Sequence, residues 1–246
     1  MPSSKHNRCR LKRLSELAFA TLRQTLWLAM VVALPISPAI AHSLDQFESE
    51  LSQREQYFER VDKPAPSFEL KDAEGRPVRL ADYAGKVIVL HFIYARCTDV
   101  CPLHADLISR IQAMVNSTPM RDRVQFLSIT TDPVNDTGEV LKSYGRLHQL
   151  DPQNWKFLTS GPEHPDMTRR LVEQFGHRFD VTPSGIQIHG VVTHVIDREG
   201  RWRGNFHGLG FNPTNLVLFV NALVNDVHPP AAPQSRGWWE TIKEMF

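Results

Sequence analysis

An apolar strand that runs directly into a pair of cysteines constrains this chain more than any other feature. Residues 86–94 are mostly β-branched and aromatic, with few polar positions, which is typical of a central strand buried on both faces. From Pro102 onward, apolar residues recur at helical spacing as far as Val115. Cys97 and Cys101 therefore lie where a buried strand gives way to a helix.

The position of the two cysteines favours reactivity over simple packing. The start of a helix presents unpaired N–H groups and a partial positive charge, and both favour a thiolate. Cys97, just before the helix, should therefore be unusually acidic and nucleophilic. Both sulfurs can face one point, which can hold a disulfide or a soft metal ion. The alternative is a pair of inert core thiols. Because the chain has only one other cysteine, Cys9, the close spacing at this junction favours redox or metal chemistry.

Charge is distributed unevenly along the 246 residues. The hydrophobic share of 41% and the charged share of 22% are ordinary for a globular protein. The first 41 residues hold six of the 28 Lys and Arg residues but one of the 27 Asp and Glu residues, so the remainder carries a net charge of −4. A mildly acidic body argues against nonspecific binding of nucleic acid.

The N-terminal segment has the pattern of an export signal. Its basic residues precede residues 26–41, which carry no charge and end in the small-x-small cleavage pattern Ala-Ile-Ala. The alternative is a membrane anchor, but sixteen uncharged residues that include Pro35 and Pro38 are short beside the roughly 20 that a span needs. We therefore expect residues 1–41 to be a signal peptide cleaved after Ala41. The mature chain would carry two cysteines in an oxidising compartment.

Proline-rich segments divide the rest of the chain into a leader, a domain and a tail. Residues 42–62 are polar, with a loose helical pattern, and are expected to form a surface helix or leader outside the core. Lys-Pro-Ala-Pro then marks the start of a domain over residues 63–228. Residues 229–246 are expected to be a flexible tail, although Trp238 and Trp239 could also dock at an interface.

Within the domain, a hairpin and then alternating strands and helices predict one three-layer α/β domain with right-handed crossovers between parallel strands. The residues before the cysteines supply the central strand, Asp136 or Thr137 should cap a helix, and residues 183–190 should form a loop. The predicted hairpin is 67–80, the further strands are 123–130, 155–159, 191–197 and 201–206, and the helices are 102–116, 137–144, 165–176 and 213–226.

Three of these features together resemble the thioredoxin superfamily. They are the Pro-Ala-Pro-Ser-Phe-Glu-Leu opening with its Asp-Ala-Glu-Gly-Arg turn (residues 64–76), the strand that feeds the cysteine pair, and the Val-Ile-Asp-Arg-Glu-Gly hairpin of residues 195–200. The resemblance implies a thioredoxin-like three-layer α/β/α sandwich with an N-terminal β-hairpin extension.

The cysteine motif is similar to that of the Sco/SenC family in particular. Cys-Thr-Asp-Val-Cys-Pro at residues 97–102 resembles the family's Cys-Pro-Asp-Val-Cys-Pro, with Thr98 in place of proline. Asp132-Pro133 followed by Asp136-Thr137 matches the family's Asp-Pro-x-x-Asp-Thr segment. The resemblance covers roughly residues 63–228.

This resemblance implies a copper site and a role in oxidase assembly. The family binds one copper through two Cys and one His, and counting back from Gly200 identifies that histidine as His189, here preceded by Ile188 where the family usually has Asp. The implied function is an exported metallochaperone for the binuclear copper centre of cytochrome c oxidase, holding Cu(I) and also Cu(II) through Cys97, Cys101 and His189. The implied partners are a copper-accepting oxidase subunit or a copper-donor chaperone, and a thioredoxin-like reductant. The implied location is periplasmic or extracytoplasmic, with or without attachment to the inner membrane.

The other histidines are weaker ligand candidates. His194 lies within the strand that follows His189 and should be a packed, hydrogen-bonded residue. His104, one helical turn beyond Cys101, is a minor candidate that we expect on the exposed face of its helix, and His91 should flank the core. Asp99, between the cysteines, suits either helix capping or recognition of a partner protein.

The donor atoms leave two functions open. Two thiolates and one imidazole suit Cu(I), whereas zinc in a structural site would prefer a fourth ligand. The rival function is a thiol-disulfide oxidoreductase in which Cys97 attacks and Cys101 resolves. Three residues between the cysteines instead of two favour the metal function, and nothing positive in the sequence favours a peroxide-reducing enzyme.

Overall fold

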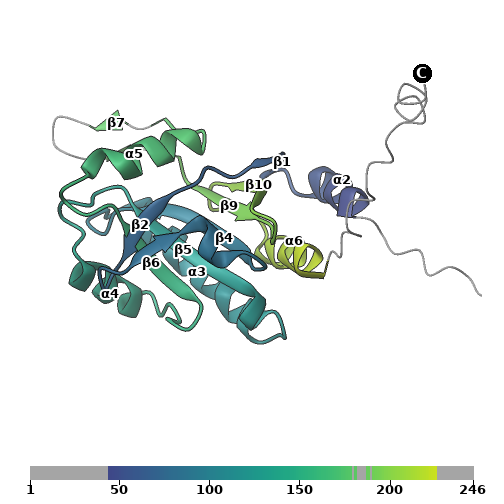
Figure 1. The fold of residues 1–246 in the computed structure, drawn as a ribbon. Helices are drawn as coiled ribbons and strands as arrows, with labels where there is room; N and C mark the ends of the chain where they lie inside the picture. Colours follow the sequence, from purple (N-terminus) through teal and green to yellow (C-terminus); the bar gives the residue numbers. More distant parts are fainter. Residues whose placement is uncertain (1–43, 179, 182–186, 189, 226–246) are drawn as a thin grey trace, which may run out of the picture. The chain divides into compact units, whose positions relative to one another are not determined.

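An eight-stranded sheet is the framework of the part of the chain that the computed structural model describes, residues 44–178, 180–181, 187–188 and 190–225 (Figure 1). The expected signal peptide, the C-terminal tail and His189 lie outside these residues. The strand order is β1-β10-β9-β4-β5-β6-β2-β3. The strands are β1 (Phe58–Pro64), β2 (Glu69–Asp72), β3 (Pro77–Arg79), β4 (Val87–Ile93), β5 (Val124–Thr130), β6 (Trp155–Thr159), β9 (Val192–Ile196) and β10 (Arg201–His207).

The strand that leads to the cysteines lies at the centre of this sheet. All seven residues of β4 are buried, as are all seven of β5, which pairs with β4 in parallel from Val87↔Val124 to Ile93↔Thr130. On its other edge β4 pairs antiparallel with β9. The prediction of a central strand buried on both faces is confirmed, and its apolar, β-branched composition is the physical reason.

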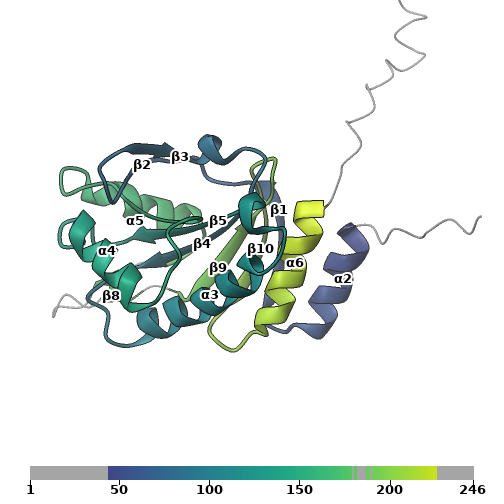
Figure 2. The ribbon, with the colours of Figure 1, turned by 90° about the horizontal axis from the view of Figure 1, so that it is seen from below.

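Helices cover both faces of the sheet (Figure 2). Buried side chains of α3 (Val100–Asn116), α4 (Gly138–Leu147) and α6 (Pro213–Asn225) join one core cluster, and those of α5 (Pro165–Gln174) join the other. The predicted three-layer α/β/α arrangement with a β2–β3 hairpin is therefore confirmed. Among the described residues, no helix is both long enough and apolar enough to cross a membrane. A further helix, α2, spans Leu44–Arg54, and 3-10 turns lie at Leu80–Tyr83 and Arg121–Arg123.

The segment before residue 63 is part of the core, which differs from the expected leader. It forms α2 and the edge strand β1, which pairs antiparallel with β10. Leu51 is fully buried, and the ring of Phe58 lies 5.1 Å from the rings of both Phe206 and Phe219. The prediction that residues 42–62 lie outside the core was wrong, because their few apolar side chains meet partners about 150 residues further along the chain.

A second small difference lies in the predicted loop of residues 183–190. Gln187–Ile188 forms the short strand β8, which pairs antiparallel with β7 (Asp180–Val181). Two-residue strands carry too little alternation of polar and apolar residues to be recognised in a sequence. The pair lies immediately before the position of His189.

Candidate functional site

The two cysteines lie at the C-terminal end of β4, where the sequence placed them. Cys97 is in the connection that follows β4, and Cys101 is in the first turn of α3, which begins at Val100. The backbone N–H of Cys101 points at the Sγ of Cys97, with an N–S distance of 3.5 Å. Both thiols are free, and Cys97 is 8% exposed against 3% for Cys101. The two cysteines thus lie close together and are both buried, with Cys97 slightly the more exposed residue.

The two thiols differ in acidity. Burial opposes ionisation of Cys97, but hydrogen bonds from the backbone N–H groups of Cys101 and Asp99 outweigh it, so the pKa of Cys97 lies below its ordinary value. Burial raises the pKa of Cys101 to about 12, and its interaction with the Cys97 sulfur adds to that rise. Near neutral pH, Cys97 is therefore the nucleophilic sulfur and Cys101 keeps its proton.

A buried aspartate holds the connection that carries Cys97. Asp136 is 1% exposed, and its Oδ2 accepts hydrogen bonds from the Ala95 N–H, at 3.0 Å, and from the Thr130 hydroxyl. Burial raises the pKa of Asp136 above its ordinary value, despite these donors. The predicted capping role belongs to Thr137, whose hydroxyl accepts from the Val140 N–H at the start of α4.

Two further contacts hold the residues around the cysteine pair in place. Arg96 forms a 2.7 Å ion pair with Asp132, which also shapes the turn before α4. The Tyr144 hydroxyl donates to the carbonyl of Cys101 at 3.0 Å. The sequence analysis missed Tyr144, and no local signal could have found it, because 43 residues separate it from its partner.

Asp99 occupies the position that precedes α3, but its carboxylate makes no capping hydrogen bond. The side chain is exposed. Of the two roles that the sequence left open, capping is therefore not seen, and an exposed carboxylate remains beside the cysteine pair.

The structure separates the histidine candidates. His194 is fully buried and hydrogen-bonded, as predicted. His104 is only 2% exposed and lies 2.8 Å from the Thr193 hydroxyl, so the prediction that it faces solvent was wrong. It is buried because that side of α3 packs on the sheet, where the His104 ring meets His91 of β4 and Thr193 of β9. Among the described residues, no three His, Cys, Asp or Glu side chains could together hold a metal ion, and His189 lies outside these residues.

The environment of His194 is a hydrogen-bonded network that the sequence did not predict. Its Nδ1 lies 2.7 Å from the Oδ1 of Asn205, which also accepts from the Trp202 indole N–H. Since that oxygen accepts, His194 carries its proton on Nδ1, and its Nε2 accepts from the Nε2–H of His177 at 2.8 Å. Burial holds the pKa of His194 well below its ordinary value.

This network also reaches the segment next to His189. A Cβ atom added to Gly190 would lie 3.1 Å from the Nδ1 of His177, so the backbone at Gly190 packs closely on that ring. The residue that follows His189 is therefore in contact with the buried network.

Comparisons with known proteins agree with this architecture. The SCO1/SenC family model matches residues 59–224. Protein SCO2, mitochondrial, from Saccharomyces cerevisiae is 27% identical over 139 residues, which cover 55% of this chain and 44% of that protein. The match thus spans about half of that relative's length.

Solved structures share the fold. A SCO1/SenC family lipoprotein from Bacillus anthracis has a TM-score of 0.61 and 26% identity, with 67% of this chain and 97% of that chain covered. Bradyrhizobium japonicum ScoI with copper bound has a TM-score of 0.54 and 25% identity, with 65% and 99% covered. The predicted thioredoxin-like fold is confirmed, and this chain belongs to the SCO1/SenC family.

Proposed function

We propose that this chain binds one copper ion through Cys97, Cys101 and His189 and transfers it during assembly of the binuclear copper centre of cytochrome c oxidase. The observation that carries the proposal is the pair of free thiols at the start of α3, whose sulfurs are close enough for the Cys101 N–H to contact the Cys97 Sγ. Membership of the SCO1/SenC family and the copper-bound ScoI structure support it.

The donor atoms fit a soft ion. Thiolate ligands select Cu(I), and an imidazole would complete a three-coordinate site. Cu(II) would also bind, with a solvent or carboxylate oxygen as a further ligand. The pKa of Cys97 is lowered, whereas Cys101, with its pKa of about 12, keeps its proton in the metal-free protein and gives it up when a metal takes its place. Binding of one Cu(I) would therefore release at least the Cys101 proton.

The unequal exposure of the two sulfurs suits transfer. Cys97 is the more exposed cysteine and lies in a connection, whereas Cys101 is anchored in a helix. A thiolate of a copper-accepting oxidase subunit or of a copper-donor chaperone would reach the metal from the Cys97 side. The exposed Asp99 lies at this edge and would face such a partner.

The second candidate function is thiol-disulfide exchange, which the difference in acidity favours. Cys97 as thiolate would attack a substrate disulfide, and Cys101 would then displace the substrate thiol, leaving a Cys97–Cys101 disulfide. Two electrons pass from the pair to the substrate, whose two sulfurs take up the Cys101 proton and one proton from solvent. A thioredoxin-like reductant would return the pair to its reduced form, which is the form that binds Cu(I).

The proposed setting is extracytoplasmic. The signal pattern of residues 1–41 supports periplasmic export, with attachment to the inner membrane as the alternative if that segment is retained. Intact-mass analysis of the protein from its host separates the two, because cleavage after Ala41 leaves a chain that begins at His42.

The test of function is an anaerobic titration of Cu(I) and Cu(II) into the reduced protein and its variants. His189→Ala should weaken copper binding by more than the roughly 10–100-fold that is typical when a residue behind a ligand is lost. Disulfide exchange, assayed in parallel, should change little, because the thiolate is stabilised by the start of α3. His207→Ala is the matched control, since His207 is exposed.

Two results would overturn this proposal. Wild-type copper affinity in His189→Ala would show that the third ligand is another residue. Wild-type binding no tighter than that of an ordinary thiol pair would reject the metallochaperone function and leave the exchange function.

A further inference from the structure

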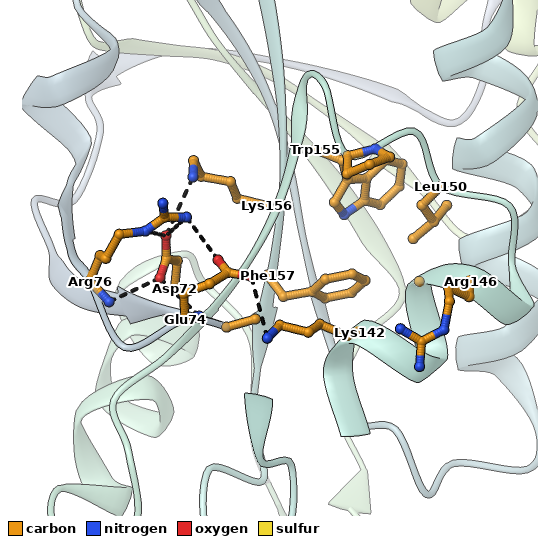
Figure 3. Close-up of a pocket in the computed structure, with 12 residues that line it drawn as sticks. Asp72, Glu74, Arg76, Lys142, Arg146, Leu150, Trp155, Lys156 and Phe157 are labelled. Carbon is orange, nitrogen blue, oxygen red and sulfur yellow. Dashed lines mark hydrogen bonds and ion pairs between the residues drawn. The ribbon is translucent and has the colours of Figure 1, made fainter. Parts of the chain in front are cut away.

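A cavity of about 380 Å³ opens where β2 leaves the edge of β6 (Figure 3). β2 pairs with β6 only at Lys71↔Thr159 and Asp72↔Leu158, because the turn after Asp72 carries the chain back into β3. The first three residues of β6, Trp155–Phe157, therefore have β5 on one side and this cavity on the other. α4 and the segment before β6 complete its walls.

One wall is apolar and rigid. It consists of Leu150, Trp155 and Phe157, which Figure 3 shows grouped on the side of the cavity where Arg146 also lies. Trp155 is held by stacking on Phe126, with ring centroids 5.4 Å apart and an interplanar angle of 12°. The ring of Phe157 fits because residue 145 is glycine: a Cβ there would lie 2.8 Å from the ring. A flat ligand would meet a preformed surface.

The opposite wall is charged, and its carboxylates already form ion pairs with neighbouring cations. Asp72 accepts from the Arg76 Nε at 2.8 Å and lies 3.4 Å from the Lys156 ammonium. Glu74 pairs with Arg76 at 2.8 Å and with Lys142 at 3.5 Å. Hydrogen bonds from Arg76 hold the pKa of Asp72 below its ordinary value, although burial opposes this. These two carboxylates leave no negative charge for a further cation.

Arg146 is the cation that this pairing does not use. Within the described part of the chain, its guanidinium donates to the Ser143 hydroxyl at 2.8 Å and forms no ion pair with a carboxylate. The guanidinium is exposed and lines the cavity beside Leu150 and Phe157. A planar guanidinium binds a carboxylate through two parallel N–H···O bonds.

We propose that this cavity binds a small aromatic monocarboxylate, with its ring against Trp155 and Phe157 and its carboxylate on Arg146. The volume lies within the roughly 300–1,000 Å³ typical of small-molecule sites, and aromatic side chains favour an aromatic ligand. Lys142 also pairs with Glu139 at 3.2 Å, so four cations at the cavity face three carboxylates and one positive charge, that of Arg146, is left for a single negative charge. The site goes beyond the copper function and shares no residue with it.

The experiment uses indole-3-acetate as the probe and follows ¹H–¹⁵N spectra of the full, reduced chain. Saturable shifts should be confined to the Trp155 indole N–H and to backbone amides that line the cavity. Indole-3-acetamide, which has the same ring and no charge, should bind about tenfold more weakly, because it loses the charge-assisted hydrogen bonds.

Variants of exposed arginines make the test specific. Arg146→Ala should weaken indole-3-acetate binding about tenfold, and Arg146→Lys should weaken it less, because it keeps the charge but not the planar fork. Arg169→Ala, on α5, is the matched control and should change nothing. The proposal is overturned if Arg146→Ala binds like wild type, if indole-3-acetamide binds as tightly as indole-3-acetate, or if the shifts lie away from the cavity.

Discussion

The cysteine pair and the buried histidine network both bring reactive side chains together, but they leave those side chains in opposite states. At the start of α3, the pKa of Cys97 is lowered while that of its neighbour Cys101 is raised. In the network, His194 is locked as a neutral tautomer between His177 and Asn205. Groups of unequal acidity suit exchange of ligands or electrons, whereas groups that satisfy one another hold the fold.

The largest expected effect distinguishes the two regions by metal binding. Cys97→Ser should weaken Cu(I) binding more than about 100-fold, because a soft thiolate donor is replaced by a hydroxyl. The free energy of unfolding should change little, since Cys97 lies in a connection and a serine hydroxyl can accept the Cys101 N–H in place of the sulfur. Anaerobic Cu(I) competition and urea unfolding measure the two quantities. Unchanged copper affinity would exclude Cys97 as a ligand.

The next effect should appear in the network as lost stability. His194→Ala should lower the free energy of unfolding by about 2–4 kcal/mol, because it leaves a cavity and an unpaired N–H on His177. Urea unfolding measures it, with His164→Ala as the control that should cost less than about 0.5 kcal/mol, because His164 is exposed and its side chain makes no capping hydrogen bond to α5. Equal costs for both variants would contradict the role given to the network.

A smaller effect should appear as a difference in alkylation rate between the two cysteines. Near pH 7.5, iodoacetamide should modify Cys97 about 30-fold faster than Cys101, because a much larger fraction of Cys97 is present as thiolate. The thiolate of a more acidic thiol is intrinsically less nucleophilic, but this offsets the difference only in part. Peptide mass spectrometry of samples quenched at successive times gives both rates. Equal rates would show that the start of α3 does not separate the two thiols.

The smallest effect should be a pH dependence of stability that originates in the network. The pKa of His194 is lower in the folded protein than in the unfolded chain, so the unfolded chain binds more protons below pH 6.5. The neutral His194 therefore contributes its full share to the free energy of unfolding above about pH 6.5. This share is lost as pH falls below that value, by at most about 1.4 kcal/mol per pH unit.

Comparison of wild type with His194→Gln isolates this contribution from those of His177 and Glu59, which belong to the same hydrogen-bonded chain. Unfolding free energies between pH 7 and pH 5 should fall less steeply in the variant. Parallel curves would mean that His194 is not the residue that takes up the proton.

The parts of the site that could be predicted depend on neighbours in sequence. The apolar run of β4, the helical spacing of α3 and the cap at Thr137 are each encoded within about ten residues, so their elements could be predicted. The same holds for the position of Cys97 and Cys101. By contrast, the burial of His104 depends on how α3 packs on the sheet, and no local sequence pattern predicts that packing.

The sequence by itself determined the strand–cysteine–helix unit, the alternation of strands and helices, and the family to which the chain belongs. The tertiary structure alone decided that residues 44–64 complete the core, that His177 and Asn205 enclose His194, and that β2 leaves a cavity beside β6. The physical reason is distance along the chain. Backbone propensity and periodicity act over a single turn or strand, whereas Phe58 and Phe206 meet only when the sheet is assembled.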